Sequence, residues 1–313
     1  MINFLPEMGI RAYIDEQLEQ FGFPYDGDLT TNENLKAVFA LQRRIPSAKR
    51  RIVIELPGIQ VHEGTENAYE SLKRKLTLGL TITPHLSLST TKYIYNDLLL
   101  NCWNIHHLHL SEEPYKKGYF RRTGPVLFCM FFDNAVVLID IMPHGSGHSD
   151  VWVNEKLIKK LHKYLPESIE RYKVKGITGH NLDSKQRLAL QKSHCNYSLK
   201  MEDGRWKMED GRWKMEDGRW KMEDGRWKME DGTVYQLMGI MSNGDCFHDI
   251  HRLMHVQRNI DYFTKVIELN EHSISTSLES NPSEKISLTI SLHGNQVKLY
   301  AIEKRAILEL SMP

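Results

Sequence analysis

"GPVLFCMFFDNAVVLIDIM", residues 124–142, is the stretch that decides the fold. Two nearly continuous apolar runs, 124–132 and 135–142, flank the pair Asp133-Asn134. Such runs are typical of strands that are covered on both faces, and a short polar pair between them favours a tight turn. The sequence therefore predicts a buried β-hairpin at the centre of the main domain.

The segments around this hairpin alternate between helical and strand patterns. Residues 50–56 and 105–111 read as strands, and the helix over 90–104 is expected to begin at Ser89 or Thr90 as its N-cap. A break is expected near Pro166, and Asp183 is the expected cap of a later helix. The predicted helices span 7–21, 32–44, 65–80, 90–104, 153–172, 183–193 and 246–270.

This pattern predicts an α+β protein with five parts. The parts are a mainly helical N-terminal region (1–89), a small antiparallel sheet core flanked by helices (90–199), a tandem repeat (200–232), a strand with a long amphipathic helix (233–270), and a C-terminal β-hairpin (285–313). The Ser/Asn-rich segment 271–284 is the expected linker before the last part.

The repeat consists of the seven residues KMEDGRW, which occur four times and are followed by KMEDG. Without residues 205–232 the chain would read NYSLKMEDGTVYQL, two strand-like runs around Asp-Gly, so the repeat is predicted to be inserted into a hairpin. We expect a β-hairpin or meander of RWKME strands in which Arg lies opposite Glu, Lys opposite Lys and Trp opposite Met. A loosely ordered insertion is the alternative.

Alternation along such strands would place the tryptophans and methionines on one face. An exposed apolar row favours contact with a partner protein or with a second copy of the chain. The residues predicted to bind such a partner are Trp206, Trp213, Trp220 and Trp227.

Composition limits the class of protein. The chain has 313 residues and a net charge of +1, so it is long enough for two domains and is not basic as a whole. No apolar run reaches membrane-spanning length, and four cysteines are scattered without metal or disulfide spacing. We therefore expect a cytoplasmic protein with reduced thiols and no membrane partner.

Histidine is plentiful, with fifteen residues, and it clusters between residues 105 and 150. In a strand, His107 and His109 project to one face and His106 to the other, whereas His144 and His148 follow the second apolar run in a Gly-rich loop. Because histidine transfers protons near neutral pH without a metal, these four residues are the candidate catalytic groups and no cofactor is expected.

The segment YKKGYFRR, residues 115–122, mixes cations with aromatic rings. Lys and Arg neutralise phosphates and aromatic rings stack on unpaired bases, so this composition favours RNA binding, although a solvated loop would have the same composition. The candidate RNA-binding residues are Tyr115, Lys116, Lys117, Tyr119, Arg121 and Arg122.

The order of elements over about residues 90–172 resembles the core of RelE-type ribonuclease toxins, within the larger barnase/EndoU/colicin/RelE group. FRRTGPVLFCMFFDNAVVLIDIMPHG takes the place of that family's basic strand, two apolar strands and catalytic loop. Histidines replace the usual Arg/Lys-rich sheet face, and the chain is much longer than the family's toxins.

The resemblance implies a metal-independent endoribonuclease of toxin or antiviral-defence type. Its substrate would be mRNA or tRNA, cleaved by attack of the ribose 2′-OH on the adjacent phosphate. An antitoxin or a phage-derived trigger protein is the further partner that this resemblance implies, and the parts outside the core would regulate the nuclease or sense the trigger.

Three other functions fit the same residues. The first is a metal-dependent phosphodiesterase, in which His107 and His109 bind zinc with His144 or Asp150; the helical residues His248, His251 and His255 offer a second such set. The second is a two-histidine phosphoesterase, whose His-x-Ser motif occurs at His85 and His109. The third is a non-enzymatic regulatory protein that binds a partner through the repeat.

Overall fold

In the computed structural model, the chain is described over 2–176, 182–201, 233–237, 239, 241–278 and 285–308, and in the repeat as backbone over 206–209, 212–216, 219–223 and 226–229. The predicted α+β class is confirmed: helices combine with several small sheets. The chain divides into two units, the first formed by 1–45, 90–95 and 247–313 and the second by 46–89 and 96–246.

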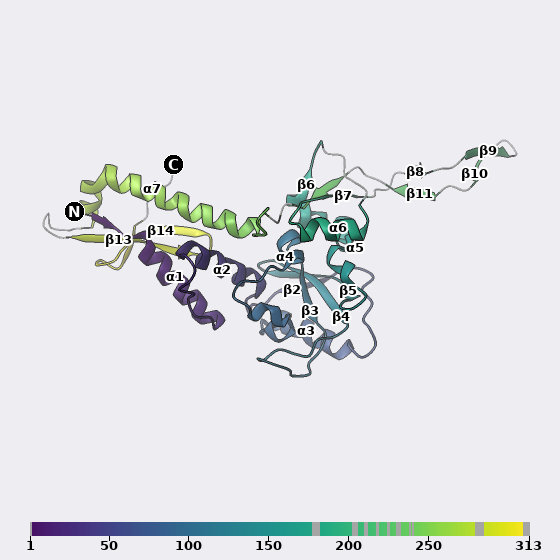
Figure 1. Ribbon diagram of the computed structural model, residues 1–313, viewed down its shortest axis with the longest axis horizontal. Coiled ribbons are helices and arrows are strands. Elements are labelled where there is room, and N and C mark those ends of the chain that lie inside the picture. The colour runs from purple at the N-terminus through teal and green to yellow at the C-terminus, as the bar shows by residue number, and fades with distance from the viewer. Residues whose placement is uncertain are drawn as a thin grey trace. The chain divides into compact units, whose positions relative to one another are not determined.

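The second unit is built on a four-stranded sheet in the order β2-β5-β4-β3 (Figure 1). The predicted buried hairpin is confirmed as β4 (Pro125–Phe131) and β5 (Ala135–Pro143), and β3 (His106–His109) lies antiparallel beside β4. The strand predicted over 50–56 is β2 (Ile52–Glu55), which adds a parallel edge next to β5.

A one-residue bulge interrupts the central hairpin. Phe128 pairs with Asp140, whereas the next residue, Cys129, pairs with Leu138, so Ile139 is an extra residue in β5. Because side chains alternate between the two faces of a strand, one extra residue exchanges the faces of every residue that follows it.

This bulge determines the face of the last histidine of the hairpin. His109 pairs with Val126, and Val126 pairs with Met142, so these three residues share one face of the sheet. His144, two residues beyond Met142, follows the same alternation and reaches the face of His109. If the same residues continued in the register of Cys129 with Leu138, without a bulge, His144 would point to the opposite face.

Helices of the second unit pack around this sheet. They are α3 (Glu66–Leu78), α4 (Leu98–Trp103), α5 (Glu155–Tyr164) and α6 (Ser184–Lys192), with short 3₁₀ turns η1 (Thr83–His85), η3 (Ser149–Val153) and η4 (Pro166–Tyr172). A further 3₁₀ turn, η2 (Leu88–Thr91), begins in this unit and ends in the first. The break at Pro166 is confirmed, because α5 ends before it, and Asp183 caps α6 by accepting from the backbone N–H of Gln186.

The prediction of one helix over 90–104 is wrong in its first half. The α-helix begins after Asp97, whose carboxylate accepts from the N–H of Leu100 at 3.1 Å. Residues 90–95 belong to the first unit, where buried Arg44 donates to the carbonyls of Lys92 and Tyr93 at 3.1 and 2.9 Å. These tertiary bonds use carbonyls that a helix would need and override the local helical pattern.

The first unit joins both ends of the chain. Helices α1 (Pro6–Phe21), α2 (Thr31–Arg44) and α7 (Phe247–Ser277) share one core with a sheet in the order β1-β13-β14-β15. The strands are β1 (Ile2–Phe4), β13 (Ile286–His293), β14 (Gln296–Ala301) and β15 (Ala306–Leu308). The turn at Gly294-Asn295 is as predicted, but the C-terminal strands do not form a separate part, because β1 pairs in parallel with β13.

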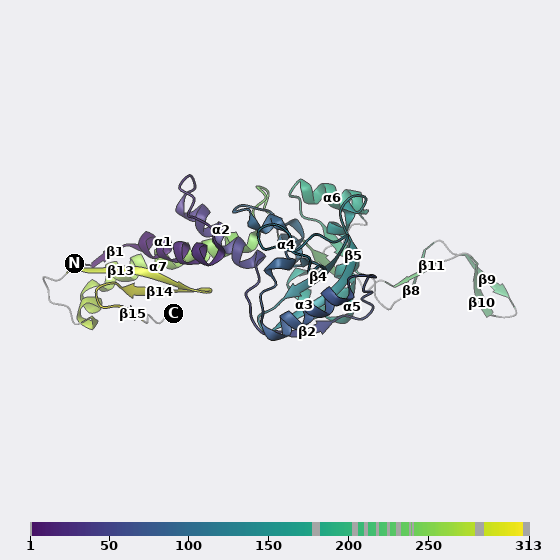
Figure 2. The ribbon, with the colours of Figure 1, turned by 90° about the horizontal axis from the view of Figure 1, so that it is seen from below.

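Helix α1 lies against β13, as Figure 2 shows. A Cβ built on Gly9 would come within 1.9 Å of the carbonyl oxygen of Ile290, so the absence of a side chain at Gly9 permits this contact.

Among the described residues, no helix combines the length and the apolar composition that are needed to cross a membrane.

The hairpin that carries the repeat is confirmed at its base. Strand β7 (Ser198–Lys200) pairs antiparallel with β12 (Val234–Gln236), and β6 (Lys173–Val174) lies on the other side of β12. The N–H of Met201 donates to the carbonyl of Thr233 at 2.8 Å, which continues this pairing by one residue.

Within the repeat, β8 (Trp206–Glu209) pairs with β11 (Arg226–Met229), and β9 (Arg212–Glu216) pairs with β10 (Arg219–Glu223) (Figures 1 and 2). The predicted register is confirmed, with Arg opposite Glu, Lys opposite Lys and Trp opposite Met. The meander is wrong: the pairs are nested as in one long hairpin. Because the units are identical, a meander and a nested hairpin have the same residue types opposite each other. The sequence therefore could not distinguish a meander from a nested hairpin. The predicted Asp-Gly turns at 210–211, 217–218 and 224–225 lie outside the described residues.

Candidate functional site

Three of the four predicted catalytic histidines meet on one face of the sheet in the second unit. The ring centroids of His109 and His144 are 5.2 Å apart, and those of His107 and His109 are 6.3 Å apart. Trp152, in η3, lies 4.8 Å from His107 and 5.9 Å from His144. The neighbouring His106 packs on Phe131 instead, as the predicted alternation requires. We call His107, His109, His144 and Trp152 the histidine cluster.

A single carbonyl holds His144. Both its backbone N–H and its ring Nδ1–H donate to the oxygen of Gly124, at 2.8 and 2.6 Å. Because Nδ1 carries the proton in that bond, the neutral ring has its lone pair on Nε2. The residue is 9% exposed. This arrangement provides an oriented proton acceptor.

A buried chain of hydrogen bonds holds the strand of His109. His85 donates from Nδ1 to the His109 carbonyl at 2.9 Å, and the ammonium of Lys75 donates to Nε2 of His85 at 3.0 Å. Lys75 also pairs with Glu112 at 3.0 Å. On the ring of His109, Nδ1 accepts from the N–H of Thr123 at 3.4 Å, so the proton of its neutral form lies on Nε2.

Burial keeps these rings neutral. Desolvation lowers the pKa of His109 to about 3 and that of His85 to about 4, and it also lowers the pKa of His107 and of His144. For His107 the carboxylate of Asp97, 3.7 Å from Nδ1, acts in the opposite direction. At neutral pH the cluster therefore consists of proton acceptors rather than imidazolium acids.

Arg122 is the member of the basic segment that acts on this cluster. Its charge contributes to the lowered pKa of His107, of His109 and of His144, and its side chain is exposed. The neighbouring Arg121 instead pairs with Glu113 at 2.9 Å. An exposed guanidinium beside an oriented histidine can bind a phosphate group.

The other predicted RNA-binding residues have different surroundings. Tyr119 is buried, with 6% of its surface exposed, so its ring does not offer a face to a base. Tyr115 and Lys116 remain exposed and contact each other, the ammonium lying 5.4 Å from the ring centroid. Lys117 is exposed in the same turn and has a left-handed φ of 55°.

His148, the fourth predicted catalytic residue, is exposed in the loop after β5. Its N–H donates to the carbonyl of Gly145 at 3.1 Å, and its charge contributes to the lowered pKa of His144. The structure thus brings His148 into the electrostatic range of the histidine cluster. For Trp206, Trp213, Trp220 and Trp227 the structure describes the backbone alone.

Two alternatives lose support. Within the part of the chain that the structure describes, no three His, Cys, Asp or Glu side chains are placed to hold a metal ion together. The phosphoesterase reading needs a reactive His85, but that ring is fully buried and both its nitrogens are engaged.

Sequence reasoning missed Trp152, Asp97 and the pair of Lys75 with His85. Asp97 lay inside the predicted helix 90–104, and Trp152 follows His144 in a short turn without periodicity. The sequence signals were weak: a tryptophan close to a histidine-rich loop and a carboxylate ten residues before His107.

Comparison with known proteins adds no identification. The chain matches no family model and no curated protein, and its structure matches no solved structure.

Proposed function

We propose that this protein is a metal-independent endoribonuclease that cleaves RNA at the histidine cluster. The observation that carries the proposal is the pair of hydrogen bonds that His144 donates, from its backbone N–H and its Nδ1–H, to the carbonyl oxygen of Gly124. These bonds leave its Nε2 as an oriented proton acceptor. Arg122 and His148 lie within its electrostatic range. A general base, a phosphate-binding cation and a general acid are the groups that this reaction requires. An exposed histidine such as His148 can supply the acid.

In the proposed reaction, Nε2 of His144 accepts the proton of a ribose 2′-OH. The 2′-oxygen attacks the adjacent phosphorus, and the bond to the 5′-oxygen of the next nucleotide breaks. His148, in its protonated form, donates a proton to that leaving oxygen, and Arg122 stabilises the charge that develops on the phosphate. The products are a 2′,3′-cyclic phosphate and a free 5′-hydroxyl.

His107 and His109 take positioning roles in this mechanism. His109 is 1% exposed and its pKa of about 3 leaves it neutral, so it is a poor proton donor at neutral pH. Its ring lies 5.2 Å from that of His144 and supports the orientation of that ring. Among the four candidate histidines, burial therefore favours His148 over His107 and His109 as the partner of His144.

The test incubates the full chain with total cellular RNA, with and without EDTA, and maps the new ends. We expect cleavage that persists in EDTA and leaves cyclic phosphates, and a loss of about 10²-fold or more in His144→Ala. His62→Ala is the matched control, because His62 is an exposed histidine of the same unit outside the cluster. Cleavage that EDTA abolishes, or full activity in His144→Ala, would contradict the proposal.

A nuclease of this kind would act in the cytoplasm on mRNA or tRNA and arrest growth, as a toxin or in antiviral defence. Such an enzyme must be inhibited until it is needed, and the proposed partner is an antitoxin that inhibits it or a phage-derived protein that activates it.

The second candidate function is partner binding without catalysis. The paired backbone of the repeat supports it, since β8 pairs with β11 and β9 pairs with β10.

A further inference from the structure

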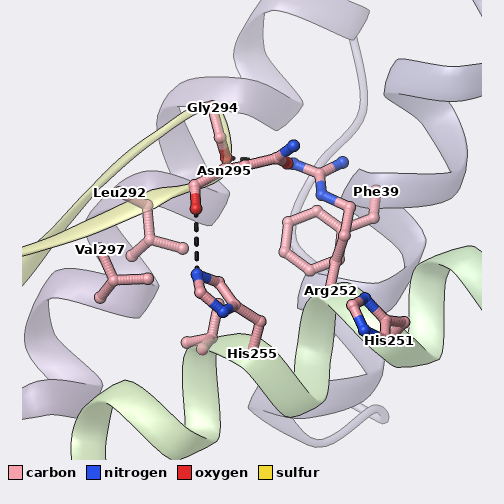
Figure 3. Close-up of a pocket in the computed structure, with 9 residues that line it drawn as sticks. Phe39, His251, Arg252, His255, Leu292, Gly294, Asn295 and Val297 are labelled. Atoms are coloured by element: carbon pink, nitrogen blue, oxygen red, sulfur yellow. Dashed lines mark hydrogen bonds between the residues drawn. The ribbon is translucent and has the colours of Figure 1, made fainter.

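The first unit contains a pocket that the proposed nuclease does not use. It has a volume of about 260 Å³ and lies between α7, the end of α2 and the β13–β14 turn (Figure 3). The residues that line it are Phe39, His251, Arg252, His255, Val256, Leu292, Gly294, Asn295 and Val297. His251, Gly294 and Asn295 are exposed, so the pocket opens to solvent.

The turn is fixed to the helix by two side chains of α7. Arg252 donates through Nη2 to the carbonyl of Gly294 at 3.3 Å, and His255 donates through Nε2 to that of Asn295 at 3.1 Å (Figure 3). The guanidinium of Arg252 also lies 3.8 Å from the ring centroid of Phe39 and donates through Nη1 to Gln42 at 3.0 Å. The wall of the pocket is therefore preorganised.

The charges of this wall are unbalanced. The lining includes one permanent cation, Arg252, and no carboxylate. The carboxylate that acts on the charge of Arg252, that of Asp249, is bound by Arg43 at 2.8 Å. Arg252 hydrogen-bonds to the phenol oxygen of Tyr13, to the Gln42 amide at 3.0 Å and to the Gly294 carbonyl at 3.3 Å. None of these acceptors is a carboxylate, and a guanidinium has five N–H donors. Such a cation is suited to an incoming anion.

The rest of the pocket is apolar and small. Val256, Leu292 and Val297 supply aliphatic surface, and the volume lies below the roughly 300–1,000 Å³ of pockets for drug-sized ligands. We propose that this pocket binds a small carboxylate with a compact apolar body, the carboxylate on Arg252 and the body against the aliphatic side chains. The site is separate from the histidine cluster and does not depend on the proposed nuclease.

Benzoate is the probe for this site, and its binding to the full chain is measured by calorimetry and by ¹H–¹⁵N NMR shifts. Acetate has the charge without the body, and benzyl alcohol has the body without the charge. We expect benzoate to bind more tightly than either by roughly tenfold or more, because a hydrogen bond to a charged group contributes more than a neutral one. Equal binding of benzyl alcohol, or no binding of benzoate, would overturn the proposal.

Two variants locate the site. Arg252→Gln should weaken benzoate binding by roughly tenfold, whereas Arg258→Gln, which removes an exposed charge of the same helix outside the pocket, should not. If Arg252→Gln fails to fold, Val297→Phe fills the cavity without touching the cation and should also reduce binding. Benzoate binding that persists at wild-type strength in folded Val297→Phe would place the ligand elsewhere and refute the proposal.

Discussion

His85 donates from its ring Nδ1 to the carbonyl oxygen of His109 at 2.9 Å, and both imidazoles are buried. Burial lowers their pKa values to about 4 and about 3, below the ordinary value of 6.5 that the unfolded chain has. Below about pH 6.5 the unfolded chain therefore binds more protons than the folded chain, and folding stability falls as the pH falls toward the folded values.

For His85 alone this loss is about 2 kcal/mol between pH 7 and pH 5. Urea unfolding at the two pH values measures it. In His85→Asn, whose Nδ2 can still donate to the His109 carbonyl, the pH dependence should shrink by about that amount. An unchanged pH dependence in this variant would show that His85 titrates normally in the folded state.

Arg122 and Arg121 form a matched pair for testing the electrostatics of the site. Replacing Arg122 by Gln should raise the pKa of His144, because a nearby positive charge disfavours the protonated ring. Replacing Arg121, which pairs with Glu113, should leave that pKa unchanged. An NMR titration of the histidine ring protons provides the measurement, and equal shifts in both variants would contradict the assignment of Arg122 to the site.

Gly9 tests the close contact of α1 with β13. Alanine is the better helix former by about 1 kcal/mol, so propensity alone predicts a stabilised Gly9→Ala protein. We expect a loss of about 2–4 kcal/mol instead, because the new Cβ would lie 1.9 Å from a backbone oxygen that cannot move freely. Gly27→Ala, where a Cβ meets open space, should be close to neutral. Thermal melts of the two variants distinguish the effects.

The repeat should tolerate removal of all four inserted units. The bond between Met201 and Thr233 would then close a loop of Glu202, Asp203 and Gly204, one residue longer than the two-residue turn that the sequence suggests. Three-residue hairpin loops need glycine at their left-handed position, and Gly204 is available there. Circular dichroism and thermal melts should show a folded protein; an unfolded one would mean that the repeat contributes to the fold.

Copy number should matter through its parity. In the nested hairpin, Glu216 and Arg219 pair around Asp217-Gly218, the Asp-Gly at the centre of the strand pairing. Adding two units moves the tip of the hairpin to the next Asp-Gly. Adding one unit moves the tip to a lysine, which is unfavourable in a tight turn. Melting temperatures across zero to six units should alternate, and a monotonic series would argue against a nested hairpin.

The sequence predicted those features that depend on local composition. Apolar continuity was sufficient for β4 and β5, and alternation correctly separated His106 from His107 and His109. Capping chemistry located α6. These signals arise within a few residues of each other, so a single sequence contains them.

Features that depend on distant residues were not predictable in this way. Residues 90–95 have a helical pattern, yet Arg44, more than forty positions away, holds them in another conformation. The pairing of β1 with β13 joins the two ends of the chain. For the site, the residue types were predicted but their burial was not, and burial decides which histidine can exchange protons with a substrate.

The extra residue at Ile139 has a consequence for how this protein should be compared with future relatives. A related chain that lacks one residue at this point would align well over β4 and β5 and would keep the same sheet. Its counterpart of His144 would still share the face of its counterpart of His109, because Phe128 with Asp140 and Cys129 with Leu138 would then be consecutive pairs of one regular ladder. A one-residue gap between the counterparts of Met142 and His144, in contrast, would turn the histidine to the opposite face, so the position of a gap in an alignment indicates whether a relative retains the same chemistry.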